Sequence, residues 1–166
     1  MATLAHPEWL DSFLAESKVP QHCIIVGISE RDDLPSDIEG WGHLRERYPA
    51  IRFALDDWGS GHNDTARLVE LRPEWVKVDR TWLVKAQHDD AAKVLLRDFA
   101  TWARHTQQPR VILEGIEPVD DVQLASWCGI TLGQGYLWGR PRPWEDLSWP
   151  HLDQRTEGAP ISFDAG

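Results

Sequence analysis

Short apolar runs alternate with segments of helical periodicity along most of this chain, and that alternation restricts the fold more than any other feature. The runs have the length and apolar content of buried strands, and they cover 23–28, 51–55, 75–78, 111–113 and 130–132. Segments with helical spacing precede or separate them, at 7–17, 36–48, 63–71, 90–105 and 118–127. Strands that alternate with helices form parallel sheets through right-handed crossovers. The sequence therefore predicts an α/β chain with about five parallel strands.

The composition of the 166 residues fits one folded domain. Hydrophobic residues make up 42% of the chain and include ten tryptophans, which is enough for a packed interior. A net charge of −10, with no visible clustering of basic residues, argues against direct binding of nucleic acid. No apolar run is long enough to span a membrane and no secretory signal is present, so we expect a cytoplasmic protein without a membrane partner. Apolar periodicity fades after residue 150, which predicts a domain over 1–150 and a C-terminal tail over 151–166.

The cysteines and histidines do not indicate a zinc site. Cys23 lies in an apolar run and Cys128 near a predicted helix end, without a C-x-x-C spacing, so both are expected to be buried free thiols. The seven histidines lack the H-x-x-x-H and H-E-x-x-H spacings of zinc sites, which favours surface or loop positions. His62 is the exception to watch, because it lies inside the acidic stretch DDWGSGHN at 56–63.

Carboxylates follow four of the five predicted strands, each at its C-terminal end. They are Glu30 after the first strand, Asp56 and Asp57 after the second, Asp79 after the third, and Glu114 and Glu117 after the fourth. In parallel α/β folds these ends share one face, where the loops build ligand and catalytic sites. Lys77 is the one internal base near them in sequence. We therefore expect an acidic rim that needs compensation by cations, by protonation or by side chains that face outward.

The acidic pair Asp56 and Asp57 opens the stretch DDWGSGHN and has two interpretations. It is either part of a metal-binding loop or an acidic turn whose side chains cap the helix that begins near Asn63. Neighbouring residues on a regular strand point to opposite faces, so both carboxylates reach one site only if the backbone bends there. Gly59 and Gly61 would permit that bend. In the structural interpretation, Lys77 forms ion pairs with these acids.

Four ordered motifs resemble those of the EAL-domain phosphodiesterases, which hydrolyse cyclic di-GMP. They are DDWGSG at 56–61, VKVDR at 76–80, EGIE at 114–117, and QGY at 134–136 followed by Arg140 and Pro141. The resemblance covers roughly 7–144 and implies a TIM-like (β/α)₈ barrel with two divalent metals, Mg²⁺ or Mn²⁺. Two metals suit this chemistry because they activate the attacking water and neutralise developing charge. With about five strands, this chain would be an incomplete barrel that lacks the first three strands of the EAL barrel.

The resemblance also assigns residue roles, motif by motif. Asp56, Asp57 and Glu114 match metal ligands, Lys77 matches the lysine that contacts the attacking water, and Gln134 matches a glutamine behind the ligands. Supporting positions in or beside the ligand pocket are Glu30, Asp79, Glu117, Arg140 and Pro141.

Several family residues have no counterpart among the 166. The Glu-Ala-Leu tripeptide, the arginine that follows it and a metal-binding asparagine are absent, and Gly27 stands where the family carries the first glutamate of Glu-x-Thr-Glu. Glu30 retains only the second acid of that motif. We therefore interpret the site residues as vestigial. We expect no resident cofactor, Mg²⁺ or Mn²⁺ only if a residual site persists, weak or no binding of cyclic di-GMP, and no phosphodiesterase activity.

A five-stranded fragment of a barrel leaves two strand edges open, and exposed edges invite pairing. We expect a homodimer or a protein partner to cover them. The tryptophans suit an interaction surface or simply fill a small core. The sequence thus favours a catalytically degenerate EAL-like domain that acts as a protein-interaction or regulatory module in bacterial signalling. The alternative is a metal-dependent cyclic di-GMP phosphodiesterase or sensor completed by oligomerisation or by a partner.

Overall fold

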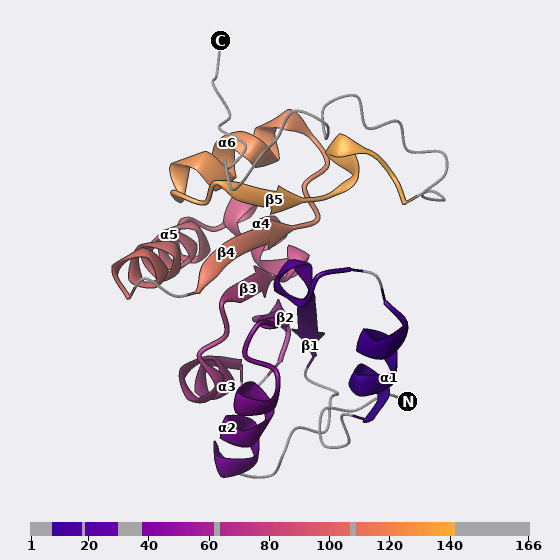
Figure 1. Ribbon diagram of the computed structural model, residues 1–166. Coiled ribbons are helices and arrows are strands. Elements are labelled where there is room, and N and C mark those ends of the chain that lie inside the picture. Colours follow the sequence, from indigo (N-terminus) through magenta and orange to yellow (C-terminus); the bar gives the residue numbers. More distant parts are fainter. Residues whose placement is uncertain (1–7, 18, 30–37, 62–63, 107–108, 142–166) are drawn as a thin grey trace.

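One five-stranded parallel sheet with strand order β1-β2-β3-β4-β5 organises the molecule (Figure 1). The computed structural model describes residues 8–17, 19–29, 38–61, 64–106 and 109–141. The strands are β1 (Ile25–Ile28), β2 (Arg52–Trp58), β3 (Trp75–Val78), β4 (Arg110–Glu114) and β5 (Leu132–Gln134). Each strand pairs in parallel with the next one along the chain, so all C-terminal ends lie on one rim. The predicted α/β architecture with five parallel strands is confirmed.

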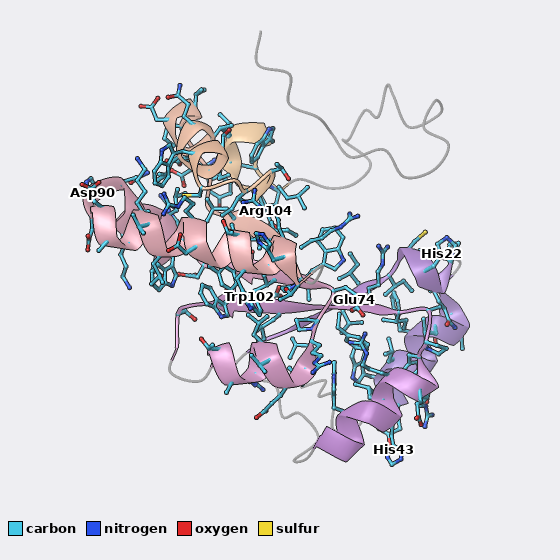
Figure 2. The ribbon with its side chains drawn as sticks, turned by 90° about the vertical axis from the view of Figure 1, so that its left-hand side faces the viewer. His22, His43, Glu74, Asp90, Trp102 and Arg104 are labelled. Carbon is cyan, nitrogen blue, oxygen red and sulfur yellow. The ribbon has the colours of Figure 1, made fainter. Side chains whose placement is uncertain are left out.

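Among the described residues, six α-helices and two 3₁₀ turns precede, separate or follow the strands (Figure 1). The helices are α1 (Glu8–Glu16), α2 (Ile38–Arg47), α3 (Asp64–Leu71), α4 (Arg80–His88), α5 (Asp90–His105) and α6 (Val119–Trp127); the turns are η1 (Gln21–Cys23) and η2 (Tyr136–Trp138). Figure 2 shows α5 from the side, with Asp90 and Arg104 near its two ends. No helix of the described residues is both long and apolar enough to cross a membrane.

The core lies between the helices and one face of the sheet. Phe53, Leu55, Val76, Val78 and Leu113 alternate along three neighbouring strands and are completely buried. Each such side chain contributes about 1.5–3 kcal/mol relative to an exposed position. The other face of these strands carries Lys77, Ile112 and Glu114, which stay partly exposed. The strand alternation therefore separates a packed outer face from an inner face that carries the polar groups.

Two strands have bounds that differ from the predicted ones. The second strand extends to Trp58 rather than stopping at Leu55, because β2 continues to pair with β3 beyond a register shift. The last strand begins at Leu132, two residues later than predicted. Ile130 instead belongs to the capping turn after α6: its N–H donates to Ala125 O while Gly129 N–H donates to Ser126 O, with Gly129 at a φ of +76°. This is the Schellman arrangement, which explains why Ile130 is apolar and buried without being in a strand.

Two further expectations need correction. The prediction that Cys23 is buried is wrong: it is exposed, because the apolar run opens with the η1 turn rather than with strand. Cys128 is a buried free thiol as predicted, and burial raises the pKa of that thiol. The separate helix α4 was not predicted. Its N-cap is Asp79, which follows β3 directly and accepts a hydrogen bond from Thr81 N–H at 2.8 Å.

Candidate functional site

A backbone bend at the end of β2 positions the acidic pair. Asp57 has a φ of +56°, and the register between β2 and β3 shifts between Leu55 and Trp58. Aspartate tolerates this left-handed conformation better than most residues with a side chain. The predicted bend is therefore present, but Asp57 itself makes it, together with Gly59 at a φ of +90°.

Lys77 occupies the space between two of the predicted metal ligands. Its Nζ lies 2.6 Å from Glu114 Oε1 and 3.2 Å from Asp56 Oδ1. Burial alone would lower the pKa of Lys77, but the hydrogen bond to Glu114 and the charges of Asp56 and Glu114 outweigh it and raise that pKa. The expected ion pairs between Lys77 and the acids of the rim are thus formed. The Asp56 contact is an ion pair without hydrogen-bond geometry, since Asp56 Oδ1 is shielded from solvent and accepts no hydrogen bond.

Gly27 on β1 makes room for the Asp56 carboxylate. A Cβ atom built at Gly27 would lie 2.5 Å from Asp56 Oδ2 and 3.2 Å from Asp56 Cγ. Real Cβ atoms essentially never approach another heavy atom so closely. The Asp56 carboxylate would therefore have to shift if position 27 carried a side chain.

Three carboxylates converge on the other side of the rim. Oxygen atoms of Asp57, Asp79 and Glu114 lie within 4.8 Å of one another, which is the spacing of groups that can share a cation. Two of these residues also have structural roles: Asp79 caps α4, and Glu114 pairs with Lys77. The site that we define as the acidic rim consists of Asp56, Asp57, Asp79 and Glu114 with Lys77 at its centre.

The remaining predicted site residues surround the acidic rim less closely. Glu117 pairs with Arg80 at 2.7 Å. Gln134 is exposed at the end of β5, where its main-chain oxygen accepts the Ile116 N–H. Arg140 lies 4.6 Å above the Tyr136 ring, and Pro141 is exposed at the end of the described chain. Glu30 lies outside the described residues.

Sequence reasoning missed several residues that support the rim. Trp82 stacks on Trp58 and donates its indole N–H to Gly59 O at 3.1 Å. The buried Asp121 accepts hydrogen bonds from Glu117 N–H and from the Gln87 side chain, which fixes the turn after β4. The signal for Trp82 was available, because it follows an aspartate N-cap by three residues and therefore points toward the β2 end. Nothing in the sequence indicated that Asp121 faces inward.

The described histidines are not part of the site. His22 on η1 and His43 on α2 lie on the outside of the molecule (Figure 2), and His88 and His105 are also exposed. The expectation of surface positions is confirmed for these four. His62 lies outside the described residues.

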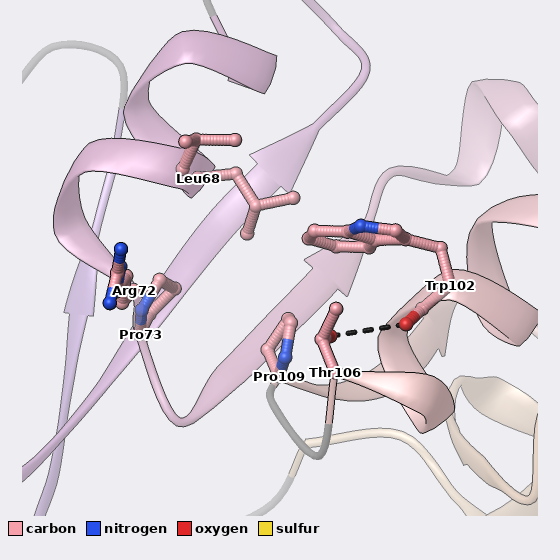
Figure 3. A pocket seen from close by; sticks show the side chains of 7 residues that line it. Leu68, Arg72, Pro73, Trp102, Thr106 and Pro109 are labelled. Atoms are coloured by element: carbon pink, nitrogen blue, oxygen red, sulfur yellow. Dashed lines mark hydrogen bonds between the residues drawn. The ribbon is translucent and has the colours of Figure 1, made fainter.

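A groove runs along the outer side of the molecule between α3 and α5. It consists of cavities of about 580 and 300 Å³ that share Leu68, Val69 and Trp102. Figure 3 shows the narrower part, where Leu68 faces the Trp102 ring above Pro73 and Pro109. The wider part reaches Trp58, which stacks on Phe99 with ring centres 3.9 Å apart. This outer groove therefore shares one side chain, Trp58, with the loop that carries the acidic pair.

Comparison with known proteins defines the family. The EAL domain model matches residues 2–141, so the chain belongs to the EAL domain family. It is 24% identical over 144 residues to the cyclic di-GMP phosphodiesterase RocR of Pseudomonas aeruginosa, which covers 86% of this chain but only 36% of RocR. It is 27% identical over 149 residues to the bifunctional diguanylate cyclase and cyclic di-GMP phosphodiesterase MucR of the same organism, covering 86% of this chain and 21% of MucR.

Solved structures confirm the barrel-like fold. The phosphodiesterase domain of Pseudomonas aeruginosa MucR, solved in complex with cyclic di-GMP, matches with a TM-score of 0.70 at 22% identity over 87% of this chain and 61% of that chain. The Klebsiella pneumoniae protein BlrP1, solved with manganese and cyclic di-GMP, matches with a TM-score of 0.70 at 20% identity over 82% of this chain and 36% of that chain. The fold is thus part of an EAL TIM-like barrel.

The donor set fits one divalent cation better than two. Asp57, Asp79 and Glu114 present oxygens at a suitable mutual spacing. On the other side, position 27 offers no side chain, and Asp56 is directed toward Lys77 instead. A second ion beside Asp56 would meet the Lys77 ammonium and no additional carboxylate from β1.

Proposed function

We propose that this EAL domain does not hydrolyse cyclic di-GMP by itself and acts as a protein-interaction or regulatory module in bacterial second-messenger signalling. The observation that carries the proposal is Gly27, which stands where the EAL motif carries a glutamate. Phosphodiester hydrolysis by two metals requires a cation on each side of the reacting phosphate. Here the glycine removes one of the carboxylates that would hold the second cation.

Two surfaces support the interaction role. Among the described residues, β1 and β5 pair on one side only, which leaves two open strand edges. The outer groove exposes Val69 and Leu95 to more than half of their area, together with Trp102. Apolar surfaces with a tryptophan are typical of protein interfaces. We propose a homodimer or a protein partner at these surfaces, with no resident metal and a cytoplasmic location.

A turnover assay tests the proposal. The purified chain is incubated with cyclic di-GMP and Mg²⁺ or Mn²⁺, and the linear dinucleotide product is measured by chromatography. We expect no product above a metal-free control, whereas RocR under the same conditions is the positive control. Metal-dependent turnover that Asp57→Ala abolishes would contradict the proposal. Light scattering after gel filtration measures the oligomeric state, and a strictly monomeric chain would exclude the homodimer.

The second candidate is a phosphodiesterase or cyclic di-GMP sensor completed by oligomerisation or by a partner. It is favoured by the convergence of Asp57, Asp79 and Glu114, which keeps one possible cation position. Titration calorimetry with cyclic di-GMP and Mg²⁺ separates the two candidates. Heat of binding that disappears in Glu114→Gln would support the sensor, and absence of heat at high micromolar ligand would exclude it for the isolated chain.

A further inference from the structure

The long helix α5 presents different chemistry on its two flanks. Toward α3 it carries apolar side chains of the outer groove, among them Leu95 and Trp102. Toward α6 it carries Lys93, Arg97 and Arg104, which follow one stripe of the helix at spacings of four and seven residues. Figure 2 shows Arg104 and Trp102 on opposite sides of α5. One flank is therefore apolar, and the other is basic.

A half-exposed tryptophan at the end of α6 contacts the first two cations without neutralising them. The centre of the Trp127 ring lies 4.4 Å from Lys93 Nζ and 5.3 Å from Arg97 Cζ, and 48% of the residue is exposed. Contact with an uncharged ring holds α5 to α6 but leaves both positive charges in place. Among the described residues, Asp98 pairs with Arg97 at 3.1 Å, and an ion pair between two such exposed side chains contributes little.

A cavity of about 310 Å³ continues the basic stripe at the C-terminal half of α5. Its walls are α5, the start of β4 and the turn that joins α6 to β5, and its polar side chains are Arg104, Arg110 and Thr131. The other described residues that line it are apolar or glycine, and none is acidic. Arg104 donates to Gly129 O at 3.4 Å and Arg110 lies 5.2 Å from the centre of the Trp75 ring, so both keep their positive charge. Such a lining suits an apolar group that lies next to an anion.

We define the basic flank as this cavity together with Lys93, Arg97, Arg104, Arg110 and Trp127. We propose that the basic flank binds an acidic segment of a partner protein, with one apolar side chain of that segment in the cavity. The chain as a whole has a net charge of −10, so cations that the fold gathers on one surface mark a place where an anionic partner is attracted. The inference rests on the proposed interaction role and names a surface and a class of partner for it.

The length of the basic flank favours an extended peptide over a compact ligand. From Lys93 to Arg104 the helix rises by about 16 Å, which an extended chain of about five residues spans. Alternate side chains of such a chain face the same way, so acidic residues at every second position would meet the stripe. Nucleic acid also carries negative charge, but the acidic remainder of this protein would repel a long polyanion.

Fluorescence anisotropy of the full chain with a labelled heptapeptide tests the proposal. The probe has glutamate at its first, third and fifth positions, leucine at its seventh and glycine elsewhere, and a control probe has lysine in place of glutamate. At low salt we expect the wild type to bind the glutamate probe with a high micromolar dissociation constant and the lysine probe not at all. Arg104→Glu should weaken binding by about tenfold, because an attraction becomes a repulsion. The matched control Lys85→Glu makes the same charge change at a lysine that packs over Trp82, and it should follow the wild type.

A second variant keeps the test independent of whether Arg104→Glu folds. Lys93→Glu leaves the contact between Arg104 and Gly129 in place and should weaken binding by about fivefold. Absence of binding by the wild type, or equal losses in Lys85→Glu and in both flank variants, would overturn the inference.

Two further probes separate docking in the cavity from plain attraction between charges. A heptapeptide with serine in place of leucine should bind more weakly, and unchanged binding would overturn the role of the cavity. An oligothymidylate that binds more tightly than the glutamate probe and depends equally on Arg104 would assign the basic flank to nucleic acid and overturn a protein partner. None of these measurements reports turnover, so phosphodiesterase activity would contradict the proposed function while peptide binding judges this inference separately.

Discussion

The two ends of β3 each carry a charged side chain, and the two are satisfied in different ways. At the N-terminal end, Glu74 accepts the Phe53 N–H at 2.8 Å with one oxygen and pairs with Arg45 through the other. At the C-terminal end, Lys77 joins two carboxylates while Asp57 and Asp79 lie nearby without a further ion pair in the described residues. One end is balanced, and the other concentrates negative charge.

This difference predicts opposite effects of substitutions at the two ends of one strand. Like charges brought together cost stability, and folded proteins keep such arrangements mainly where a ligand or a reaction requires them. The Glu74 carboxylate holds β2 to β3 by accepting the Phe53 N–H, so substitutions there should act on stability. At the acidic rim, loss of one acid should relieve repulsion.

Glu74→Ala gives the largest expected effect at the balanced end. The change leaves the Phe53 N–H and the Arg45 guanidinium without their acceptor, and it should lower the free energy of unfolding by about 2–3 kcal/mol. Urea denaturation measures the loss. Glu70→Ala, an exposed glutamate on α3, should change stability by less than about 0.5 kcal/mol. Equal effects of the two variants would refute the structural role of Glu74.

Gly59→Ala tests the packing that holds the rim loop. Gly59 has a φ of +90°, and a Cβ atom there would lie 1.8 Å from Trp82 Nε1. Strain and overpacking together should cost about 2 kcal/mol. The matched control is Gly42→Ala inside α2, where a Cβ atom meets nothing within 4 Å, and it should gain about 0.5–1 kcal/mol. The two glycine variants should thus shift the urea midpoint in opposite directions.

Asp57→Asn tests the charge excess of the rim. Asparagine tolerates the positive φ of this position, and removal of one charge near Asp79 and Glu114 should raise stability by about 0.5–1 kcal/mol. Asp90→Asn in the first turn of α5 should lower stability by about 0.3–1 kcal/mol, because a negative charge there favours the helix dipole. Thermal unfolding shows whether each variant is more or less stable than the wild type. A destabilised Asp57→Asn would contradict repulsion at the rim.

The smallest expected effect is a pH dependence of stability that comes from Asp11, a carboxylate away from both ends of β3. Asp11 on α1 accepts hydrogen bonds from Tyr48 Oη at 2.7 Å and from Arg47, and the Tyr48 bond leads the causes that lower the pKa of Asp11. A lowered pKa contributes stability above the unfolded-state value of about 3.9, and this is lost as the pH falls through the folded-state pKa. The midpoint difference between wild type and Asp11→Asn should therefore hold to about pH 4 and close below it. Tyr48→Phe should reduce that dependence.

Sequence patterns predicted the elements that are governed by local periodicity. The helix at 90–105 and the strand at 75–78 were located to the residue, since their apolar spacing is unambiguous. The end of β2 was not, because pairing with β3 carries the strand through an acidic pair that has little strand propensity of its own. Ile130 was misassigned because a Schellman contact and a short strand both place one apolar residue after a glycine.

The sequence predicted which residues gather at the site, but it did not predict the distances and contacts between them. Parallel strands bring their C-terminal ends together, which correctly placed Asp56, Asp57, Asp79 and Glu114 on one rim with Lys77 among them. The contact between Asp56 and Gly27 depends on side-chain rotamers and on distances across strands, which no sequence spacing encodes. The roles of these residues as metal ligands or catalytic groups stay predictions, as does the boundary at residue 150.

Trp58 has a consequence that extends beyond packing. One face of its ring stacks on Phe99 in the outer groove, and its neighbour Gly59 is tied to Trp82 beneath the acidic rim. A partner that moves this ring on occupying the groove would also move the loop that presents Asp57. Thermodynamic reciprocity then requires that whatever changes the rim alters the affinity of that partner by the same factor. Under that condition, Trp58 would couple the outer groove to the acidic rim.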